Sequence, residues 1–469
     1  MILTNNPINV NMLEKEIYRI SCEYGREILK TILTKLDEQL MQERDRASYR
    51  HKGKRRTVLK TLMGEVEYER SVYQYKDETG RKSCIYLLDE ALGFETVGFM
   101  SEMLSENIAK ASCEMPYRKA AQSISELTGQ NISHTSAWKV VQALGEKVDE
   151  GERQAAKLAK NNEGKGTNET KLLFEEQDGI FLTLQGKDRE KMGKSAEMKI
   201  SIAYTGATKT GKNRYNLTGK VACANFEGVD SFYARKEGVI AKTYNIDEIE
   251  MRVLNGDGAN WIKRSLIDDT VHYQLDTFHR NKAILKYVSD PVARKTIFEL
   301  LYTKQIDFML SVIESYSNST EDEKERENFL TLLKYFQNNK DGLISYKRRG
   351  LDLPMSTNDI EYRGCGAMES NVYSIIGFRM KRRRANWSIN GGNNLARLLT
   401  LKATGRLVEV LSELASSVLP PKYTEEVQTT LSAAKSPERM GKGYNGFSKA
   451  SIPSSQKWMK DLFSLKPLY

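Results

Sequence analysis

The chain has 469 residues, of which 39% are hydrophobic and 29% are charged, a balance that excludes wholesale disorder and suits roughly two to four structural units. Lys and Arg total 72 against 62 Asp and Glu, and this net charge of +10 favours a polyanionic partner such as nucleic acid. Five scattered cysteines without a C-x-x-C pair exclude a zinc ribbon and a disulfide framework. Without a secretory pattern at its start or an apolar run of ~20 residues, the chain is expected to be cytoplasmic.

Residues 1–112 are predicted to form a helical region with a β-hairpin. An apolar stripe at helical spacing predicts a helix over 11–48, and the alternating stretch TLMGEVEYERSVYQY predicts strands. Residues 94–112 return to a helical pattern. Between the first helix and the strands lies a basic stretch that we expect to contact DNA through Lys52, Lys54, Arg55 and Arg56.

Residues 113–165 have the size and punctuation of a helix-turn-helix. Two short helical patterns flank a turn at 129–131, and Ser133 is a plausible N-cap for the second helix. His134 and Lys139 would then lie near the start of the recognition helix, where base edges are read. An ordinary helical hairpin would give the same pattern, and the residues alone do not separate the two.

From residue 171 the apolar residues alternate, which predicts strands through Asp178 and over 198–204, 249–253 and 271–275, with one more strand in RYNLTGKVACANF. A helix is expected near 226–243. Three strands, a helix, a strand and more helix is the order of an RNase H-like sheet. We therefore predict an α/β fold whose RNase H-like core comprises residues 166–280 and 351–415.

Residues 281–350 are predicted to be an all-helical insertion in this core. Tyr302, Ile306, Met309, Ile313 and Tyr316 step by three and four, as in an amphipathic helix. Residues 416–469 carry Pro-Pro and Ser/Lys-rich stretches and are expected to form a C-terminal tail.

Two acids end or interrupt strand patterns. Asp178 lies inside an apolar strand, where a carboxylate is costly unless it is paired or binds a cation, and Asp257 lies between glycines in LNGDGANW. Two such acids, joined by a third from a helix, would suit a pair of Mg²⁺ ions. Glu361 and Glu369 are both candidates for the third acid, and the alternative for each aspartate is an ordinary turn.

The frame GATKTGK over 206–212 could suggest a phosphate-binding loop, but Asn213 replaces the Ser or Thr that would hold Mg²⁺ and strand rather than helix follows. We interpret it as a hairpin turn. His279 in DTFHR lies close to Asp276 and is either a site residue or a structural histidine.

The densest basic cluster begins one to two helical turns after Glu369. It could clamp phosphates, or it could be a solvated face, and its tryptophan could stack on an unpaired base or anchor the helix. The cluster comprises Arg379, Lys381, Arg382, Arg383, Arg384 and Trp387.

The sequence resembles the transposases of the ISLre-two kind of bacterial insertion sequence, which are related to the Mutator-like group. The resemblance covers roughly residues 12–410 and rests on many blocks in order, including RTVLKTLMGEVEYERSVY, LLDEALG, PYRKAAQSI, ISHTSAW, EQDGIFLTLQG, EMKISIAYTG, LNGDGANW, DTFHRNKAI, GAMESNVYSIIGFRMKRRRANWS and GGNNLARLL. The block PYRKAAQSI departs from the family at Pro116, where Ser is usual.

The resemblance implies a catalytic triad that binds two Mg²⁺ or Mn²⁺ ions on an RNase H-like domain with an all-helical insertion before the last acid. The implied triad is Asp178, Asp257 and Glu369, which favours Glu369 over Glu361. The Mutator-like group also carries an acid or cysteine, two residues and a histidine after the second acid, and Asp276-Thr-Phe-His279 matches this form.

We therefore expect a DNA transposase that cleaves at terminal inverted repeats and transfers the freed strand to target DNA. The expected partner is double-stranded DNA, and joining two ends to one target implies at least a homodimer at the active step. Two alternatives remain: an RNase H-like nuclease without strand transfer, and a non-catalytic helix-turn-helix DNA-binding regulator.

Overall fold

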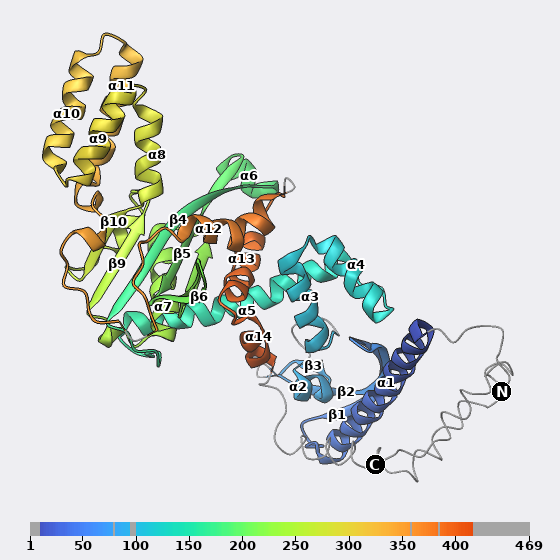
Figure 1. Ribbon diagram of the computed structural model, residues 1–469. Coiled ribbons are helices and arrows are strands. Elements are labelled where there is room, and N and C mark those ends of the chain that lie inside the picture. The colour runs from blue at the N-terminus through green and yellow to red at the C-terminus, as the bar shows by residue number, and fades with distance from the viewer. Residues whose placement is uncertain (1–9, 78–79, 94–99, 357–358, 383–384, 416–469) are drawn as a thin grey trace, which may run out of the picture. The chain divides into compact units, whose positions relative to one another are not determined.

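The computed structural model describes residues 10–77, 80–93, 100–356, 359–382 and 385–415 (Figure 1). They form a mixed α/β protein that divides into two compact units. The described residues of 1–108, 118–136 and 412–469 belong to one unit, and those of 109–117 and 137–411 to the other. The expected tail, 416–469, lies outside the described residues.

The first unit combines a long helix with a three-stranded antiparallel sheet of order β1-β2-β3. Leu33 and Leu36 of the helix are buried in one cluster with Leu59, Val66 and Tyr68 of the sheet. The basic stretch, predicted to precede the strands, lies within the first strand. The elements are α1 (Val10–Glu43), β1 (Arg50–Thr61), β2 (Gly64–Lys76), β3 (Lys82–Ile85), α2 (Leu87–Leu92), α3 (Glu102–Glu114) and α4 (Tyr117–Thr128).

The segment predicted as a helix-turn-helix forms α4 and then α5 (His134–Lys160). The predicted cap is present, since the hydroxyl of Ser133 accepts a hydrogen bond from the Ser136 amide at 3.0 Å. The second helix, expected to be short, has 27 residues. Its apolar stripe continues through Val140, Leu144 and Val148, which are all buried, and this burial favours the longer helix.

The second unit is built on a five-stranded mixed sheet of order β10-β9-β4-β5-β8. Strand β5 runs antiparallel to β4 and β8, whereas β9 and β10 run parallel to β4. The seven strands of the unit are β4 (Leu172–Thr183), β5 (Ser195–Tyr204), β6 (Gly206–Gly211), β7 (Arg214–Thr218), β8 (Val221–Asn225), β9 (Met251–Gly256) and β10 (Val271–Leu275).

The stretch RYNLTGKVACANF, predicted as one strand, forms two. It breaks at Gly219, whose φ of +66° is costly for any other residue, so that β7 pairs with β6 and β8 joins the main sheet. The 206–212 segment is the first strand and turn of the β6–β7 hairpin, as predicted.

Helices follow and flank these strands. Among the described residues, none is both long and apolar enough to cross a membrane. The α-helices are α6 (Gly186–Met192), α7 (Val229–Thr243), α8 (Thr277–Tyr287), α9 (Pro291–Tyr302), α10 (Ile306–Ser319), α11 (Glu323–Asn338), α12 (Met368–Asn371), α13 (Ile389–Ala403) and α14 (Leu407–Ala415). Shorter or irregular turns are η1 (Ile246–Glu248), η2 (Ile262–Ser265), η3 (Lys340–Gly342), η4 (Tyr346–Arg348) and the π-helix η5 (Val372–Lys381).

Helices α8–α11 form a bundle beyond the edge strand β10 (Figure 1). Their core side chains, such as Ile297, Ile313 and Phe336, share one buried cluster with Leu254 and Leu275 of the sheet. The predicted stripe that begins at Tyr302 spans two helices, because Lys304 adopts a φ of +61° and ends α9 there. Tyr302 is consequently 74% exposed.

Candidate active site

Three acids lie side by side because of the register of three parallel strands. Gln177 of β4 pairs with Gly256 of β9, and Gly256 pairs with Leu275 of β10. The next residue after each partner is an aspartate, so the pairing brings acids separated in the sequence to one edge of the sheet. These acids are Asp178, Asp257 and Asp276.

Asp276 and His279 are linked by the start of α8. Asp276 is the N-cap of this helix, and its Oδ1 accepts a hydrogen bond from the His279 amide at 3.1 Å. Its Oδ2 accepts a second bond from Asn255 at 2.8 Å. The Asp-x-x-His spacing is thus the spacing of a helix cap, and it holds the His279 Nε2 at 3.9 Å from the Asp178 Oδ2.

The charges around Asp178 are mostly of its own sign. Burial raises the pKa of the Asp178 carboxyl, and the carboxylates of Asp257 and Asp276 raise it further. The Gly179 amide, at 2.7 Å from Oδ1, and His279 act in the opposite direction without cancelling the shift. A site with this excess of negative charge favours binding of a cation.

Glu369 comes from a helix tethered to the same face of β4. Glu176 lies two residues before Asp178 and therefore on the same side of the strand. Its buried carboxylate accepts bonds from the Tyr204 hydroxyl and from three consecutive amides at the start of α12. Those amides belong to Gly366 at 2.9 Å, Ala367 at 3.1 Å and Met368 at 3.2 Å.

The π-helix η5 packs against β4 beyond Asp178, on the same face of the strand. A Cβ added at Gly377 would meet the Ile180 side chain at 3.5 Å, and Ile180 is two residues beyond Asp178 on the same face. The helical segment that begins at Met368 and carries Glu369 therefore runs along β4 from Glu176 to Ile180. Glu369 itself is exposed.

Glu361, the other candidate for the third acid, lies elsewhere. Its backbone forms a bridge with Ala207 of the β6–β7 hairpin, with N···O distances of 2.9 and 3.0 Å. That hairpin follows the end of β5, where Tyr204 pairs with Phe174, four residues before Asp178 along β4. The fold therefore favours Glu369 over Glu361.

The described residues contain no group of three or more His, Cys, Asp or Glu side chains already arranged as a metal site. The expected triad is thus assembled only in part, with Asp178 beside Asp257 and with Glu369 tethered over the same strand. The donor chemistry fits a hard divalent cation, because the neighbouring carboxylates repel one another and carboxylate oxygens are the ligands that Mg²⁺ prefers.

The sequence over residues 3–412 matches the model of a family described as "Uncharacterised protein family (UPF0236)". The chain belongs to this family. A UPF0236 protein of Caldanaerobacter subterraneus subsp. tengcongensis is 24% identical over 86% of this chain and 80% of its own length. A UPF0236 protein of Streptococcus gallolyticus, named for its position in a vanSb 3′ region, is 24% identical over 85% of this chain and 84% of its own.

A further relative from Caldanaerobacter subterraneus subsp. tengcongensis has the same 24% identity over 86% of this chain and 80% of its own length. The name of this relative consists of eleven numbered designations joined together. None of these names states an activity.

Three residues that hold the candidate site of this UPF0236 protein in place were not predicted. Glu176 and Asn255 link Asp276 to the start of α12, since Asn255 donates to both carboxylates, at 3.1 and 2.8 Å. Tyr335 of α11 donates to the Asp257 carbonyl at 2.7 Å, so the helical insertion holds the loop that carries this acid. Strand alternation could have selected Glu176, but nothing in the sequence indicates the partner of Tyr335.

The basic residues of the UPF0236 chain differ in accessibility. Exposed side chains are those of Lys52, Lys54, Arg55, Arg56, His134, Lys139, Lys381 and Arg382. Two of them form ion pairs with carboxylates: Arg56 pairs with Glu67, and the Lys54 Nζ lies 4.0 Å from the Asp37 Oδ2. Arg383 and Arg384 lie outside the described residues.

The expectation that Arg379 and Trp387 contact DNA is corrected by their burial. Arg379 donates to the Ser112 carbonyl at 2.7 Å and its guanidinium lies 5.3 and 5.4 Å from the rings of Tyr117 and Trp387. Trp387 donates to the Met380 carbonyl at 2.8 Å. The Arg379 Nε and the Trp387 indole N–H both donate inside the fold, which supports the anchoring alternative for Trp387.

Proposed function

We propose that this protein is a DNA transposase whose acids, Asp178, Asp257 and Glu369, act on phosphodiester bonds. The observation that carries the proposal is the strand register that sets Asp178 beside Asp257, together with the bonds from Glu176 to the start of α12, the helix that carries Glu369. The sheet order supports an RNase H-like core, because an antiparallel run of three strands is followed by a helix and two parallel strands.

Two Mg²⁺ or Mn²⁺ ions held by the three acids would activate the nucleophile and stabilise the leaving oxygen. In the first step, water attacks a phosphodiester at the end of the element, a P–O bond forms, and the bond to the 3′ oxygen breaks. In the second step, the freed 3′-hydroxyl attacks a phosphodiester of the target, so each new P–O bond replaces one that is lost. His279, whose backbone amide donates to the Asp276 cap, has its Nε2 3.9 Å from Asp178 and would contact a phosphate bound there.

DNA binding outside the acids would use the exposed cations of β1 and the first turns of α5. Phosphate contacts through Lys and Arg give affinity, and the start of a recognition helix reads bases. The net charge of +10 supports a polyanionic partner. At least two copies would act together, because two element ends join one target.

The naming of a relative also supports a mobile gene. One protein from a single organism carries eleven designations, which is the pattern expected when a gene has multiplied within a genome.

The test is cleavage of labelled terminal-repeat DNA by the variant Asp178→Ala/Asp257→Ala/Glu369→Ala in the presence of Mg²⁺. Binding should survive and cleavage should vanish, whereas unchanged cleavage would exclude the triad. Products joined to a target plasmid distinguish a transposase from a nuclease without strand transfer. Binding without any metal-dependent cutting by the wild type would instead identify a regulator.

A further inference from the structure

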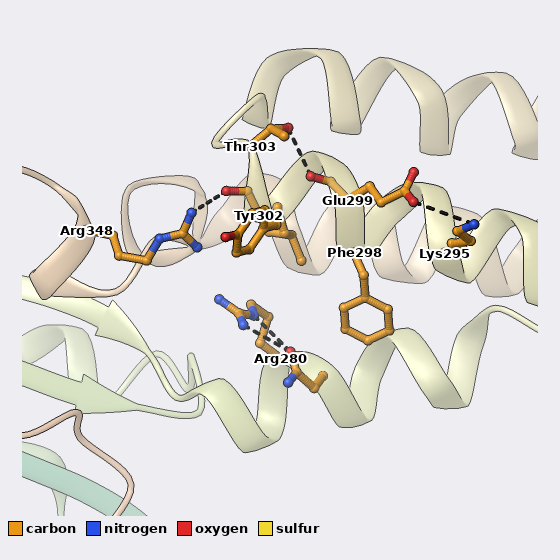
Figure 2. A pocket seen from close by; sticks show the side chains of 9 residues that line it. Arg280, Lys295, Phe298, Glu299, Tyr302, Thr303 and Arg348 are labelled. Carbon is orange, nitrogen blue, oxygen red and sulfur yellow. Dashed lines mark hydrogen bonds and ion pairs between the residues drawn. The ribbon is translucent and has the colours of Figure 1, made fainter.

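A cavity of about 580 Å³ lies between α8, α9 and the turn η4, outside the acids (Figure 2). This volume falls within the range of roughly 300–1,000 Å³ typical of small-molecule sites. Its walls combine cationic, aromatic and aliphatic side chains. The lining residues are Arg280, Asn281, Lys295, Phe298, Glu299, Leu301, Tyr302, Thr303 and Arg348.

Two arginines, Arg280 of α8 and Arg348 of η4, line this cavity. Arg280 is half-buried, and both burial and the charge of Arg348 lower its pKa. Its Nη1 donates to the Leu343 carbonyl at 2.7 Å, and Arg348 donates to the Tyr302 carbonyl. Within the described part of the chain neither guanidinium forms an ion pair, and the Asp276 carboxylate raises the pKa of Arg280 without cancelling its net lowering. An anion between them would relieve the repulsion.

An aromatic wall lies next to the two arginines. Phe298 and Tyr302 are one turn apart on α9, and Figure 2 shows Arg348 beside Tyr302, whose ring centroid is 5.0 Å from the guanidinium carbon. Tyr302 presents most of its surface to solvent. The one lining carboxylate, Glu299, lies 3.9 Å from Lys295 and therefore does not neutralise the arginines.

Together, two cationic side chains and two aromatic side chains match the two halves of a nucleotide. The phosphate would lie between the arginines, and the base or sugar would lie against the aromatic rings. Only an unpaired nucleotide offers its base in this way, because a base in a duplex is stacked between its neighbours.

The cavity is also close to the acids in the fold. Arg280 directly follows His279 on α8, and α8 begins at the cap formed by Asp276. We propose that the cavity binds one unpaired nucleotide of the DNA strand that enters the acids, with its phosphate at Arg280 and Arg348 and its base at Phe298 and Tyr302. This inference rests on the proposed function, since it names a substrate contact of the same site.

The test compares Arg280→Gln/Arg348→Gln with the control Arg326→Gln. Arg326 is an exposed arginine of the same helical bundle that donates to the Thr320 carbonyl at 3.0 Å and lies outside the cavity. Fluorescence anisotropy would measure binding of a blunt duplex and of one with a single-stranded overhang, in EDTA and at several salt concentrations.

We expect the double variant to bind the overhang about tenfold more weakly than the wild type. Its plot of log K against log salt should lose ~0.7 of slope for the single-strand phosphate contact, while the control keeps both values. Arg280→Lys/Arg348→Lys should keep the slope, and Tyr302→Ala should lose the overhang preference at unchanged slope. Equal slope and affinity in the double variant and the control would overturn the proposal.

Two further arms separate the remaining outcomes. In the first arm, adenosine monophosphate is added as a competitor. If it does not displace the overhang DNA, a DNA strand remains the occupant. If the free nucleotide binds saturably and the protein shows no preference for the overhang, that assignment is wrong. If the arginine variants change overhang binding but the wild type never cuts DNA, the nucleotide pocket stands and the transposase proposal fails. If the wild type cuts and the variants bind normally, only the pocket fails. Arg348→Gln alone serves if the double variant does not fold.

Discussion

Glu175 and Asp178, on the two faces of strand β4, have opposite electrostatic surroundings. On one face, Glu175 meets Lys236 at 2.6 Å and Arg252 at 3.1 Å. On the other face, Asp178 has two further carboxylates as neighbours and a histidine at 3.9 Å. The first acid is neutralised by neighbouring cations, whereas the second has other carboxylates around it.

The Glu175 side is built for stability. Burial lowers the pKa of Lys236, but Glu175 and Glu237 outweigh it and raise the pKa above its ordinary value, so the lysine stays charged in the core. Glu237 also meets Arg252 at 2.9 Å, which closes a network of two cations and two anions. Such a network has no charge left for a ligand.

Glu176 lies between Glu175 and Asp178 in the sequence, and its carboxylate is stabilised in a third way, by hydrogen bonds. Burial raises its pKa, whereas the Tyr204 hydroxyl and the three amides at the start of α12 lower it. A carboxylate held by backbone amides ties two distant segments together without another charge. The lesson is that an acid in a strand indicates a site only when its neighbours fail to neutralise it.

The largest expected effect is on catalysis. Asp178→Asn should reduce DNA cleavage by ~10³-fold or more, because several kcal/mol of transition-state stabilisation depend on a charged ligand here. Gel assays with labelled terminal-repeat DNA would measure the rate, and anisotropy should show unchanged binding. A variant that cuts at the wild-type rate would show that the two faces do not differ in function.

Glu175→Gln should instead affect stability. It leaves Lys236 and Arg252 facing Glu237 alone, and breaking a buried ion pair on one side costs about 3 kcal/mol or more. Urea unfolding would measure the loss. The matched control is Glu250→Gln, which breaks an exposed pair with Lys171 and should leave the midpoint unchanged. Equal midpoints for both variants would contradict the assigned role of Glu175.

Divalent cations should stabilise the wild type through the Asp178 face. At 100 times the dissociation constant the gain is about 2.7 kcal/mol, and it should disappear in Asp178→Asn/Asp257→Asn. Because the pKa of Asp178 is raised, protons compete with the cation at a higher pH than at an ordinary aspartate, and the gain should shrink as the pH falls through that raised value. Thermal melting with and without Mn²⁺ at several pH values would measure it. A gain of equal size in the double variant would place the cation elsewhere.

The smallest effect is expected for the tether. Glu176→Gln replaces one acceptor oxygen by a donor, so the amides of 366–368 lose part of their support and the helix of Glu369 shifts. Cleavage should fall by about 10–100-fold, the usual cost of disturbing a group that orients a metal ligand. Glu361→Gln should change neither cleavage nor folding. If both variants behave alike, Glu176 does not position Glu369.

Patterns within short stretches of the chain were enough to predict the local elements. Alternation placed strands at Asp178 and over 271–275, and the spacing from Asp276 to His279 is the spacing of an N-cap. These features were predictable because strand period and helix capping depend on residues only a few positions apart.

Which charged side chains come together depends on the folded chain as a whole. Nothing local tells that Gln177 pairs with Gly256, that Glu175 faces Lys236 while Asp178 faces other acids, or that Arg379 is buried. These outcomes depend on strand register and on contacts between residues tens to nearly two hundred positions apart, as in the bond from Gly366 to Glu176. Electrostatic surroundings are a property of packing, and a sequence pattern does not contain them.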